Sequence, residues 1–328
     1  MNSVDKIHKK TTQWALNYLK ANSYTLKSLE PKLIQKTPWS YVLEFDTSIG
    51  FIYLKHTPKQ LALEPFITHI LHDEFHASVP KIIAHNPELD CFLMENAGRS
   101  LRVILKRNFD ASLLCKAIDE FTITQLIVAN HLTRFLDIGV PDWRLDKLAH
   151  LFGNLLQQKE ILMADGLIES EINTLERMLP KIEDLCDKLA AYSIKETIVQ
   201  CDFHDNNILL DESSGVITFI DLGEIVISHP FFSLVGCLRQ TKIHHGISET
   251  DIAYQQLMDA CFKNFLAHES KINLLEAFKI AQILWIIYEA LSQNRLRLAC
   301  DIDRFIAFQR HGKLRDSLKE LINCYALI

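Results

Sequence analysis

Residues 198–221 combine two short apolar runs with a polar turn, in a region where the chain otherwise shows long helical segments. The apolar runs span residues 208–210 and 216–220, and the turn between them contains Gly215. Short apolar runs joined by a turn with glycine are typical of a β-hairpin. We therefore predict a hairpin at this position, surrounded by helices.

The outer ends of the predicted hairpin carry oxygen ligands. Asn207 precedes the first strand and Asp221 follows the second, so strand pairing is expected to bring the two side chains together. A carboxylate and an amide oxygen suit Mg²⁺, which keeps further positions for phosphate oxygens and water. Asp202 lies one loop away, where it can accept the proton of a hydroxyl that attacks a γ-phosphate.

The chain changes character near Gly98, which we interpret as a hinge because glycine tolerates unusual backbone angles. Alternating apolar runs predict two hairpins before this point, and helical spacing predicts a helix preceding them and another between them. These strands are expected at 41–45, 51–55, 81–85 and 91–95, and the helices at 4–22 and 60–75. After Gly98, helices are expected at 113–136, 145–163, 169–192, 251–268, 274–300 and 303–325. The pattern predicts an α+β protein divided into residues 1–96 and 97–328.

Composition narrows the class of partner. The 328 residues carry a formal net charge of −6, so no basic field attracts nucleic acid or an anionic membrane, and a small-molecule partner is expected. The 8 cysteines form no Cys-x-x-Cys pair, which favours reduced, buried thiols and a cytoplasmic location. We find neither a signal-peptide pattern nor an apolar run of ~18 residues, so no membrane association is expected.

The loop before the hairpin resembles that of the aminoglycoside phosphotransferase and choline kinase-like small-molecule kinases. Their usual loop is His-Gly-Asp-x-His-x-x-Asn followed by a hairpin and Ile-Asp, and residues 200–207 here read Gln-Cys-Asp-Phe-His-Asp-Asn-Asn. The second histidine, the aspartate and the asparagine match, whereas Gln200 and Cys201 replace the first histidine and the glycine. Further on, Ser233 stands where the family has an aspartate that caps a helix.

The resemblance implies a two-lobed protein-kinase-like fold, with a small antiparallel-sheet N-lobe that contains one helix and a larger, mostly helical C-lobe. It also implies that Lys55, at the end of a strand, neutralises nucleotide phosphates and that Glu64 on the next helix holds it in place. The alternative for both residues is an ordinary surface position. Pro65 is acceptable in the first turn of that helix, where its missing N–H costs nothing.

The resemblance implies two further nucleotide contacts. Met94, Glu95 and Asn96 lie on the linker where the family binds the adenine ring through backbone groups. The turn at residues 35–40 is expected to cover the phosphates, with the hydroxyl or backbone N–H of Ser40 as the contact. This turn has no glycine, unlike the Gly-rich loop of protein kinases, and an ordinary turn is the alternative.

These features predict a Mg²⁺-dependent phosphotransferase that moves the γ-phosphate of ATP or GTP to a hydroxyl of a small metabolite, such as an aminoglycoside, choline or a sugar-like compound. Asp202 would be the catalytic base, and Asp251 or Glu289 could attract a cationic acceptor. The alternative is a catalytically inactive pseudokinase that binds nucleotide or a partner protein, suggested by Gln200, Cys201 and the glycine-free turn. Retention of Asp202, Asn207 and Asp221 argues against an inactive pseudokinase.

Three other positions carry weaker expectations. Glu224, three residues beyond Asp221, is expected to be solvated, with a second metal-binding carboxylate as the alternative. His244 and His245 are expected to be exposed loop residues. The apolar run at 285–288 is expected to lie in the core.

Overall fold

The computed structural model describes residues 3–325 and contains two compact units, each assembled from separate stretches of the chain. The first unit comprises the described residues up to Gly98 together with Leu210–Gly223 and Arg297–Phe308. The second comprises Arg99–Leu209, Glu224–Leu296 and the described residues from Gln309 onward. The expected α+β class, with a small antiparallel sheet followed by a largely helical region, is confirmed.

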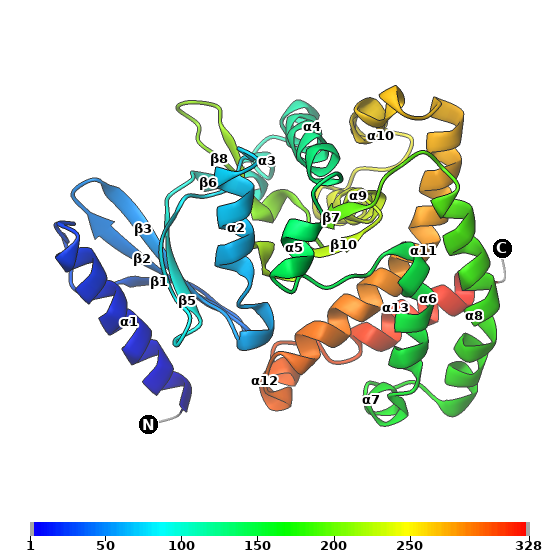
Figure 1. The fold of residues 1–328 in the computed structure, drawn as a ribbon, viewed down its shortest axis with the longest axis horizontal. Helices are drawn as coiled ribbons and strands as arrows, with labels where there is room; N and C mark the ends of the chain where they lie inside the picture. Colours follow the sequence, from blue (N-terminus) through cyan, green and yellow to red (C-terminus); the bar gives the residue numbers. More distant parts are fainter. Residues whose placement is uncertain (1–2, 326–328) are drawn as a thin grey trace. The chain divides into compact units, whose positions relative to one another are not determined.

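The first unit is built on an antiparallel sheet with the strand order β1–β2–β3–β5–β4 (Figure 1). Leu43 of β2 pairs with Leu54 of β3, which in turn pairs with Leu93 of β5, so the centre of the sheet is apolar. Both expected hairpins and both expected helices are present. The elements are α1 (Ser3–Ala21), β1 (Lys32–Lys36), β2 (Tyr41–Thr47), β3 (Gly50–His56), η1 (Lys59–Leu61), α2 (Glu64–Asp73), β4 (Ile82–Asn86), β5 (Cys91–Glu95), β9 (Ile217–Phe219) and α12 (Ile302–Ala307).

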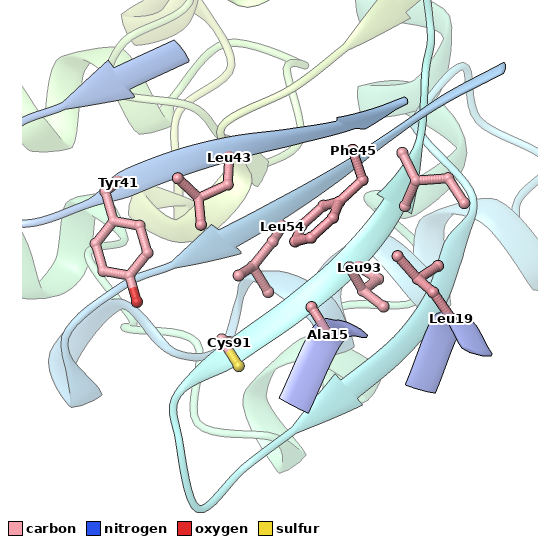
Figure 2. Packing of buried hydrophobic residues seen from close by; sticks show 9 residues of the cluster. Ala15, Leu19, Tyr41, Leu43, Phe45, Leu54, Cys91 and Leu93 are labelled. Atoms are coloured by element: carbon pink, nitrogen blue, oxygen red, sulfur yellow. The ribbon is translucent and has the colours of Figure 1, made fainter. Parts of the chain in front are cut away.

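Two helices cover opposite faces of this sheet (Figure 1). Ala15 and Leu19 of α1 pack against Leu54 and its sheet neighbours in a fully buried cluster (Figure 2). Because successive side chains of a strand point to opposite faces, Lys55 of β3 lies on the face that α2 covers. The alternation along β3 thus places the Lys55 side chain on the face covered by α2, whereas Leu54 packs in the core on the other face.

The second unit is mostly helical, with β7 paired antiparallel to β10 through Val199 and Val226. Its elements are β6 (Arg99–Ser100), α3 (Leu101–Leu105), α4 (Ala111–Val128), α5 (Thr133–Asp137), α6 (Leu145–Leu156), α7 (Lys159–Ala164), α8 (Glu169–Ala190), β7 (Thr197–Val199), η2 (Asp205–Asn207), β10 (Val226–Ser228), α9 (Phe231–His245), α10 (Ile252–Lys263), η4 (Phe265–Ala267), α11 (Lys271–Leu298) and α13 (Lys313–Tyr325). The chain crosses between the units within β8 (Ile208–Leu210), within η3 (Leu222–Glu224) and near the end of α11, where Arg297 begins the last stretch of the first unit. Among the helices of residues 3–325, none combines the length and apolar character that crossing a membrane requires.

Three of the long helices were predicted as continuous, and these predictions are wrong. The segments 113–136 and 145–163 each split into two helices, and 303–325 splits into α12 and α13. In the last case Gln309 and Gly312 adopt left-handed backbone angles, with φ of 59° and 83°, which a helix cannot accommodate. Apolar periodicity continues across such breaks because the flanking helices bury the same kind of face.

The expected hairpin is present, and its turn is closed by one aspartate. The Asp211 N–H donates to the Val216 carbonyl over 3.0 Å, and the Asp211 carboxylate accepts from the Ser213 N–H and hydroxyl. Gly98 lies beside this hairpin with φ of +110°, and a Cβ there would sit 2.4 Å from the Leu210 carbonyl oxygen. Only glycine therefore fits where the sheet of the first unit ends.

Candidate functional site

Lys55 is held by two carboxylates inside the first unit. Its Nζ lies 2.8 Å from Oε1 of Glu64, 2.6 Å from Oε2 of the same residue and 2.5 Å from Oδ1 of Asp221. The side chains of Lys55 and Glu64 are 6% and 4% exposed, whereas that of Asp221 is 38% exposed. Both surface alternatives are thereby wrong, and the expected Lys55–Glu64 pair is present in the structure.

The charges of this cluster do not balance, since one ammonium faces two carboxylates. Burial alone would lower the pKa of Lys55, but Asp221 and Glu64 outweigh it, so the pKa is raised and the lysine stays charged. Burial raises the pKa of Glu64, with Lys55 opposing and Asp221 adding to the effect. The excess negative charge favours the arrival of a cation at the more exposed carboxylate, Asp221.

Asp221 adopts a left-handed backbone conformation, with φ of 63°. Aspartate and asparagine tolerate this region better than other residues with a side chain, but it remains uncommon. The next residue, Leu222, is buried, and its N–H donates to Oε1 of Glu64 over 3.2 Å. The turn after β9 therefore directs the Asp221 carboxylate to Lys55 and at the same time anchors Glu64.

Gly223 completes this turn, and we predict that Gly223→Ala weakens the cluster. A Cβ there would lie 3.0 Å from the Leu61 carbonyl oxygen and 3.3 Å from Oε2 of Glu64. The strain should lower the free energy of unfolding by roughly 1–3 kcal/mol, measured by urea denaturation. Gly153→Ala is the matched control, because its Cβ would meet nothing closer than 3.9 Å in the middle of α6. That control should be neutral or stabilising by up to ~1 kcal/mol, and equal losses in both variants would contradict the prediction.

Asp202 and Asn207 come together in the second unit. Nδ2 of Asn207 donates to Oδ2 of Asp202 over 3.0 Å and to its carbonyl oxygen over 2.9 Å. Nδ1 of His204 accepts from the Asn206 N–H, so the proton on Nε2 is available to Oδ1 of Asp202, 2.9 Å away. The carboxylate is thus oriented from both sides, and its side chain remains 49% exposed.

These bonds set the protonation of Asp202. Burial raises the pKa of its carboxyl, but the hydrogen bonds from His204 and Asn207 and the charge of Arg310 outweigh that effect, because water still reaches half of the side chain. The pKa therefore lies below its ordinary value. Asp202 is a carboxylate at neutral pH, as an acceptor for a hydroxyl proton must be.

The two departures from the usual loop are accommodated by backbone anchoring. The Gln200 N–H donates to the Ser233 hydroxyl over 2.9 Å, and this hydroxyl donates back to the Gln200 carbonyl over 3.2 Å. The sequence predicts that Ser233 caps a helix, and this prediction is wrong. Ser233 lies inside α9, where its hydroxyl holds the loop. Cys201 Sγ lies 3.5 Å from the Glu224 carbonyl oxygen, and burial raises the pKa of this thiol to about 12.

The expectation of a solvated Glu224 is wrong. The residue is 9% exposed, and the Ser292 hydroxyl of α11 donates to its Oε2 over 3.3 Å. The Arg295 guanidinium also donates to the Glu224 carbonyl over 3.2 Å. Glu224 therefore ties the segment after the hairpin to α11.

Asp205, inside the loop, is the centre of a buried charge network. Nε of Arg102 donates to Oδ1 of Asp205 over 2.8 Å, Nη2 of Arg102 lies 2.7 Å from the same oxygen as an ion pair, and Oδ2 of Asp205 lies 2.7 Å from Nε2 of His245. The side chains of Asp205 and His245 are each 3% exposed. His244 and His245 both belong to α9 rather than to a loop, so that part of the expectation is wrong for both, and only His244 is exposed.

The Asp205 network predicts acid sensitivity. Burial raises the pKa of the Asp205 carboxyl, but the bonds from Arg102 and His245 lower it further, so it lies below the ordinary value near ~3.9. A depressed pKa stabilises the folded state above the ordinary pKa, and the contribution is lost as pH falls through the folded value. Asp205→Asn should cost about 1–3 kcal/mol at pH 7, and the gap to wild type should narrow near pH 3.

Urea denaturation at both pH values tests this expectation, with Asp187→Asn on the exposed side of α8 as the matched control. The control should follow the wild type at each pH. A gap between Asp205→Asn and wild type that does not change with pH would contradict the assignment.

The remaining expected nucleotide contacts lie in the first unit. Ser40 ends the turn between β1 and β2, where its N–H donates to Oγ1 of Thr37 over 2.9 Å. Met94 is half-buried near the end of β5, and Glu95 and Asn96 are exposed as the chain leaves the sheet. Their contact with a nucleotide stays a prediction.

Sequence reasoning did not find Gly223, Asp205, Arg102 or Ser233 in the roles described above. The Asp-Leu-Gly run after a strand was a usable signal for Gly223, since glycine is the usual residue where the backbone of a turn closely approaches another segment. No local pattern pointed to Arg102, which is 103 residues from its partner.

The chain was compared with known proteins. A sequence model described as the phosphotransferase enzyme family matches residues 123–255, a range that includes Asp202, Asn207 and Asp221. The resemblance read from the loop is thereby confirmed. No curated protein matches this sequence.

Solved structures of small-molecule kinases share the fold of this chain. An amicoumacin kinase solved with AMP-PNP, Ca²⁺ and its substrate has a TM-score of 0.62 at 14% identity, over 97% of this chain and 96% of that one. The ethanolamine kinase of Plasmodium vivax gives 0.59 at 13% identity, over 88% and 82%. The choline kinase of Streptococcus pneumoniae gives 0.56 at 13% identity, over 94% and 98%. At these identities the likeness establishes the kinase-like fold.

Proposed function

We propose that the protein transfers the γ-phosphate of ATP, or of GTP, to a hydroxyl of a small metabolite with the help of Mg²⁺. The observation that carries the proposal is the buried Lys55–Glu64 pair with Asp221 against it. A buried ion pair contributes little net stability, so a lysine held in this way indicates a role in binding anions. Lys55 would orient the nucleotide phosphates, with Glu64 holding its ammonium in position.

Asp202 is proposed to position the acceptor hydroxyl and to take its proton. Its low pKa makes it a weak base, which suits a loose phosphoryl transition state in which the hydroxyl loses its proton late. His204 and Asn207 keep the carboxylate in one orientation. The chain's own contribution is therefore mainly the alignment of the attacking oxygen.

The residues present fit a magnesium ion. Nδ2 of Asn207 donates to Asp202, which leaves the amide oxygen of Asn207 as the atom for a cation, and Asp221 supplies a partly exposed carboxylate. Among the described residues, no group of three His, Cys, Asp or Glu side chains is arranged to hold a metal. Mg²⁺ with few protein ligands is usually bound together with substrate phosphates, whose charge it neutralises. Asn207 and Asp221 thus remain the proposed ligands.

The acceptor is proposed to meet Glu289 rather than Asp251. Burial raises the pKa of Glu289, and the negative charge of Asp202 adds to this effect against Arg239, which places Glu289 in the electrostatic environment of the catalytic carboxylate. Asp251 instead accepts from the Ser248 N–H in the loop before α10. A carboxylate close to the base favours a hydroxyl compound that also carries an amine, such as choline or an aminoglycoside.

The division of labour follows the proposed lobes. Residues 1–96 would bind the nucleotide, with Ser40 on the phosphates and Met94, Glu95 and Asn96 at the base, and residues 97–328 would bind the acceptor. A cytoplasmic location is part of the proposal, because the nucleotide and the reduced cysteines both fit it. Nucleic acid and membranes are not proposed as partners.

A radiometric transfer assay tests the proposal. The purified protein is incubated with Mg²⁺ and γ-labelled ATP or GTP, together with a panel of hydroxyl compounds in matched amine-bearing and neutral pairs. Transfer of label to at least one amine-bearing hydroxyl compound, abolished by EDTA, is the expected result. Nucleotide binding without transfer to any compound would instead indicate the pseudokinase, although the backbone anchoring of Gln200 by Ser233 removes one of the reasons for that alternative.

A further inference from the structure

The turn between β1 and β2, residues 37–40, differs most from what a phosphate-binding loop usually contains. Protein kinases place a glycine-rich loop here, but this turn reads Thr-Pro-Trp-Ser and has no glycine. A turn without glycine cannot adapt its backbone freely to a nucleotide. Some other feature must therefore set its position.

Thr37 closes the turn on itself. The Thr37 N–H donates to the Ser40 carbonyl over 2.8 Å, and its Oγ1 accepts from the N–H groups of Ser40 and Trp39 at 2.9 and 3.3 Å. Pro38 has no N–H to offer. The backbone donors of the turn are thus engaged within it, so its shape is fixed before any ligand arrives.

The helix α12, more than 260 residues further along the chain, docks on this turn within the first unit. The Trp39 ring lies 5.5 Å from the Phe308 ring in an edge-to-face arrangement and 6.5 Å from the Phe305 ring. The Arg304 guanidinium donates to the Thr37 carbonyl over 3.3 Å. Edge-to-face pairs are a favourable geometry for aromatic rings.

The sheet register connects the turn to Lys55. Ser40 is followed by Tyr41, which pairs with His56, and by Val42, which pairs with Lys55. A displacement of the turn therefore moves the strand directly beside the lysine. The turn that α12 contacts therefore leads directly into the strand that pairs with Lys55.

We propose that α12 is the positioning element of the nucleotide-binding turn. Phe305, Phe308 and Arg304 hold Trp39 and Thr37 in one position, which a flexible glycine-rich loop would not keep by itself. The inference rests on the proposed function, because it takes the phosphates to be bound beside Lys55. A turn fixed in advance loses less conformational freedom when the nucleotide binds, so α12 raises nucleotide affinity.

Phe308→Ala tests this inference, with Ile306→Ala as the matched control. Both side chains are partly exposed, at 43% and 47%, so neither substitution is expected to unfold the protein. The dissociation constant of Mg·AMP-PNP, measured by isothermal titration calorimetry, should rise about tenfold in Phe308→Ala and stay unchanged in the control. Phe308→Tyr keeps the aromatic ring and should therefore bind Mg·AMP-PNP with wild-type affinity.

Two further readouts separate positioning from a general loss of structure. Hydrogen exchange of residues 32–42 without nucleotide should be faster in Phe308→Ala and unchanged elsewhere in the sheet. In the transfer assay, KM for ATP should rise while kcat changes little. Equal affinity of Phe308→Ala and wild type would overturn this inference alone, whereas a wild-type protein that does not bind Mg·AMP-PNP would overturn the proposed function and this inference with it.

Discussion

Replacing Asp202 by asparagine should lower kcat for phosphoryl transfer about 10²- to 10⁴-fold, the range that a positioned general base contributes. Asparagine has the same shape, and the second bond from Asn207 goes to the backbone carbonyl of residue 202, which the substitution leaves in place. Folding and KM for ATP should therefore stay close to wild type. Steady-state kinetics with the acceptor found in the transfer assay measure both constants.

Asp259→Asn is the control for this variant, since Asp259 is 66% exposed in a surface pair with Lys271. It should retain full activity. Because the pKa of Asp202 is depressed, its carboxyl stays ionised throughout the neutral range, and we expect no fall in kcat from its protonation between pH 6 and 8, a range well above ~3.9. Wild-type activity in Asp202→Asn would remove Asp202 from the mechanism.

Replacing Lys55 by methionine should damage both activity and folding. Loss of one preorganised charge at the phosphates typically costs about 10²- to 10³-fold in rate. Removal of one partner from a buried ion pair typically costs about 3–5 kcal/mol, and here it leaves Glu64 buried and facing Asp221. The turnover number and the urea midpoint of the same preparation measure the two effects.

The double variant Lys55→Met with Glu64→Gln separates the loss of activity from the loss of stability. Glutamine removes the uncompensated charge but still offers an oxygen to the Leu222 N–H, so most of the lost stability should return. Activity should not return, because the ammonium is still missing. Lys32→Met is the matched control on the same sheet: its pair with Glu44 is 3.8 Å long with Lys32 73% exposed, and such pairs contribute about 0–1 kcal/mol. Recovery of activity in the double variant would refute the role of Lys55.

Local pattern was enough to predict most of the first unit and the loop around Asp202. Short apolar runs bounded by turns located β2, β3, β4 and β5, and along β2 buried and half-buried residues alternate as period two predicts. The Lys55–Glu64 pair was implied by the family resemblance, which names a lysine at the end of a strand and a glutamate on the next helix, and the structure contains this ion pair. Asp202 and Asn207 could be found because short-range spacing sets their contact.

Contacts between distant segments could not be predicted in this way. Asp205 meets Arg102 and His245, which are 103 and 40 residues away, and nothing in the local sequence of any of them signals a buried charge. Glu224 was placed in solvent for the same reason, since its partner Ser292 is 68 residues further on. Burial of a polar group becomes visible only when its partner is known.

The membership of Arg297–Phe308 in the first unit has a consequence for how the protein is made. A ribosome synthesises the sheet early, yet the helix that docks on Trp39 is translated more than 260 residues later. Until this helix is synthesised, Trp39 of the nascent sheet lacks its contact with Phe308. Release of a prematurely terminated polypeptide lacking this helix would leave an exposed aromatic residue for chaperones or proteases to recognise.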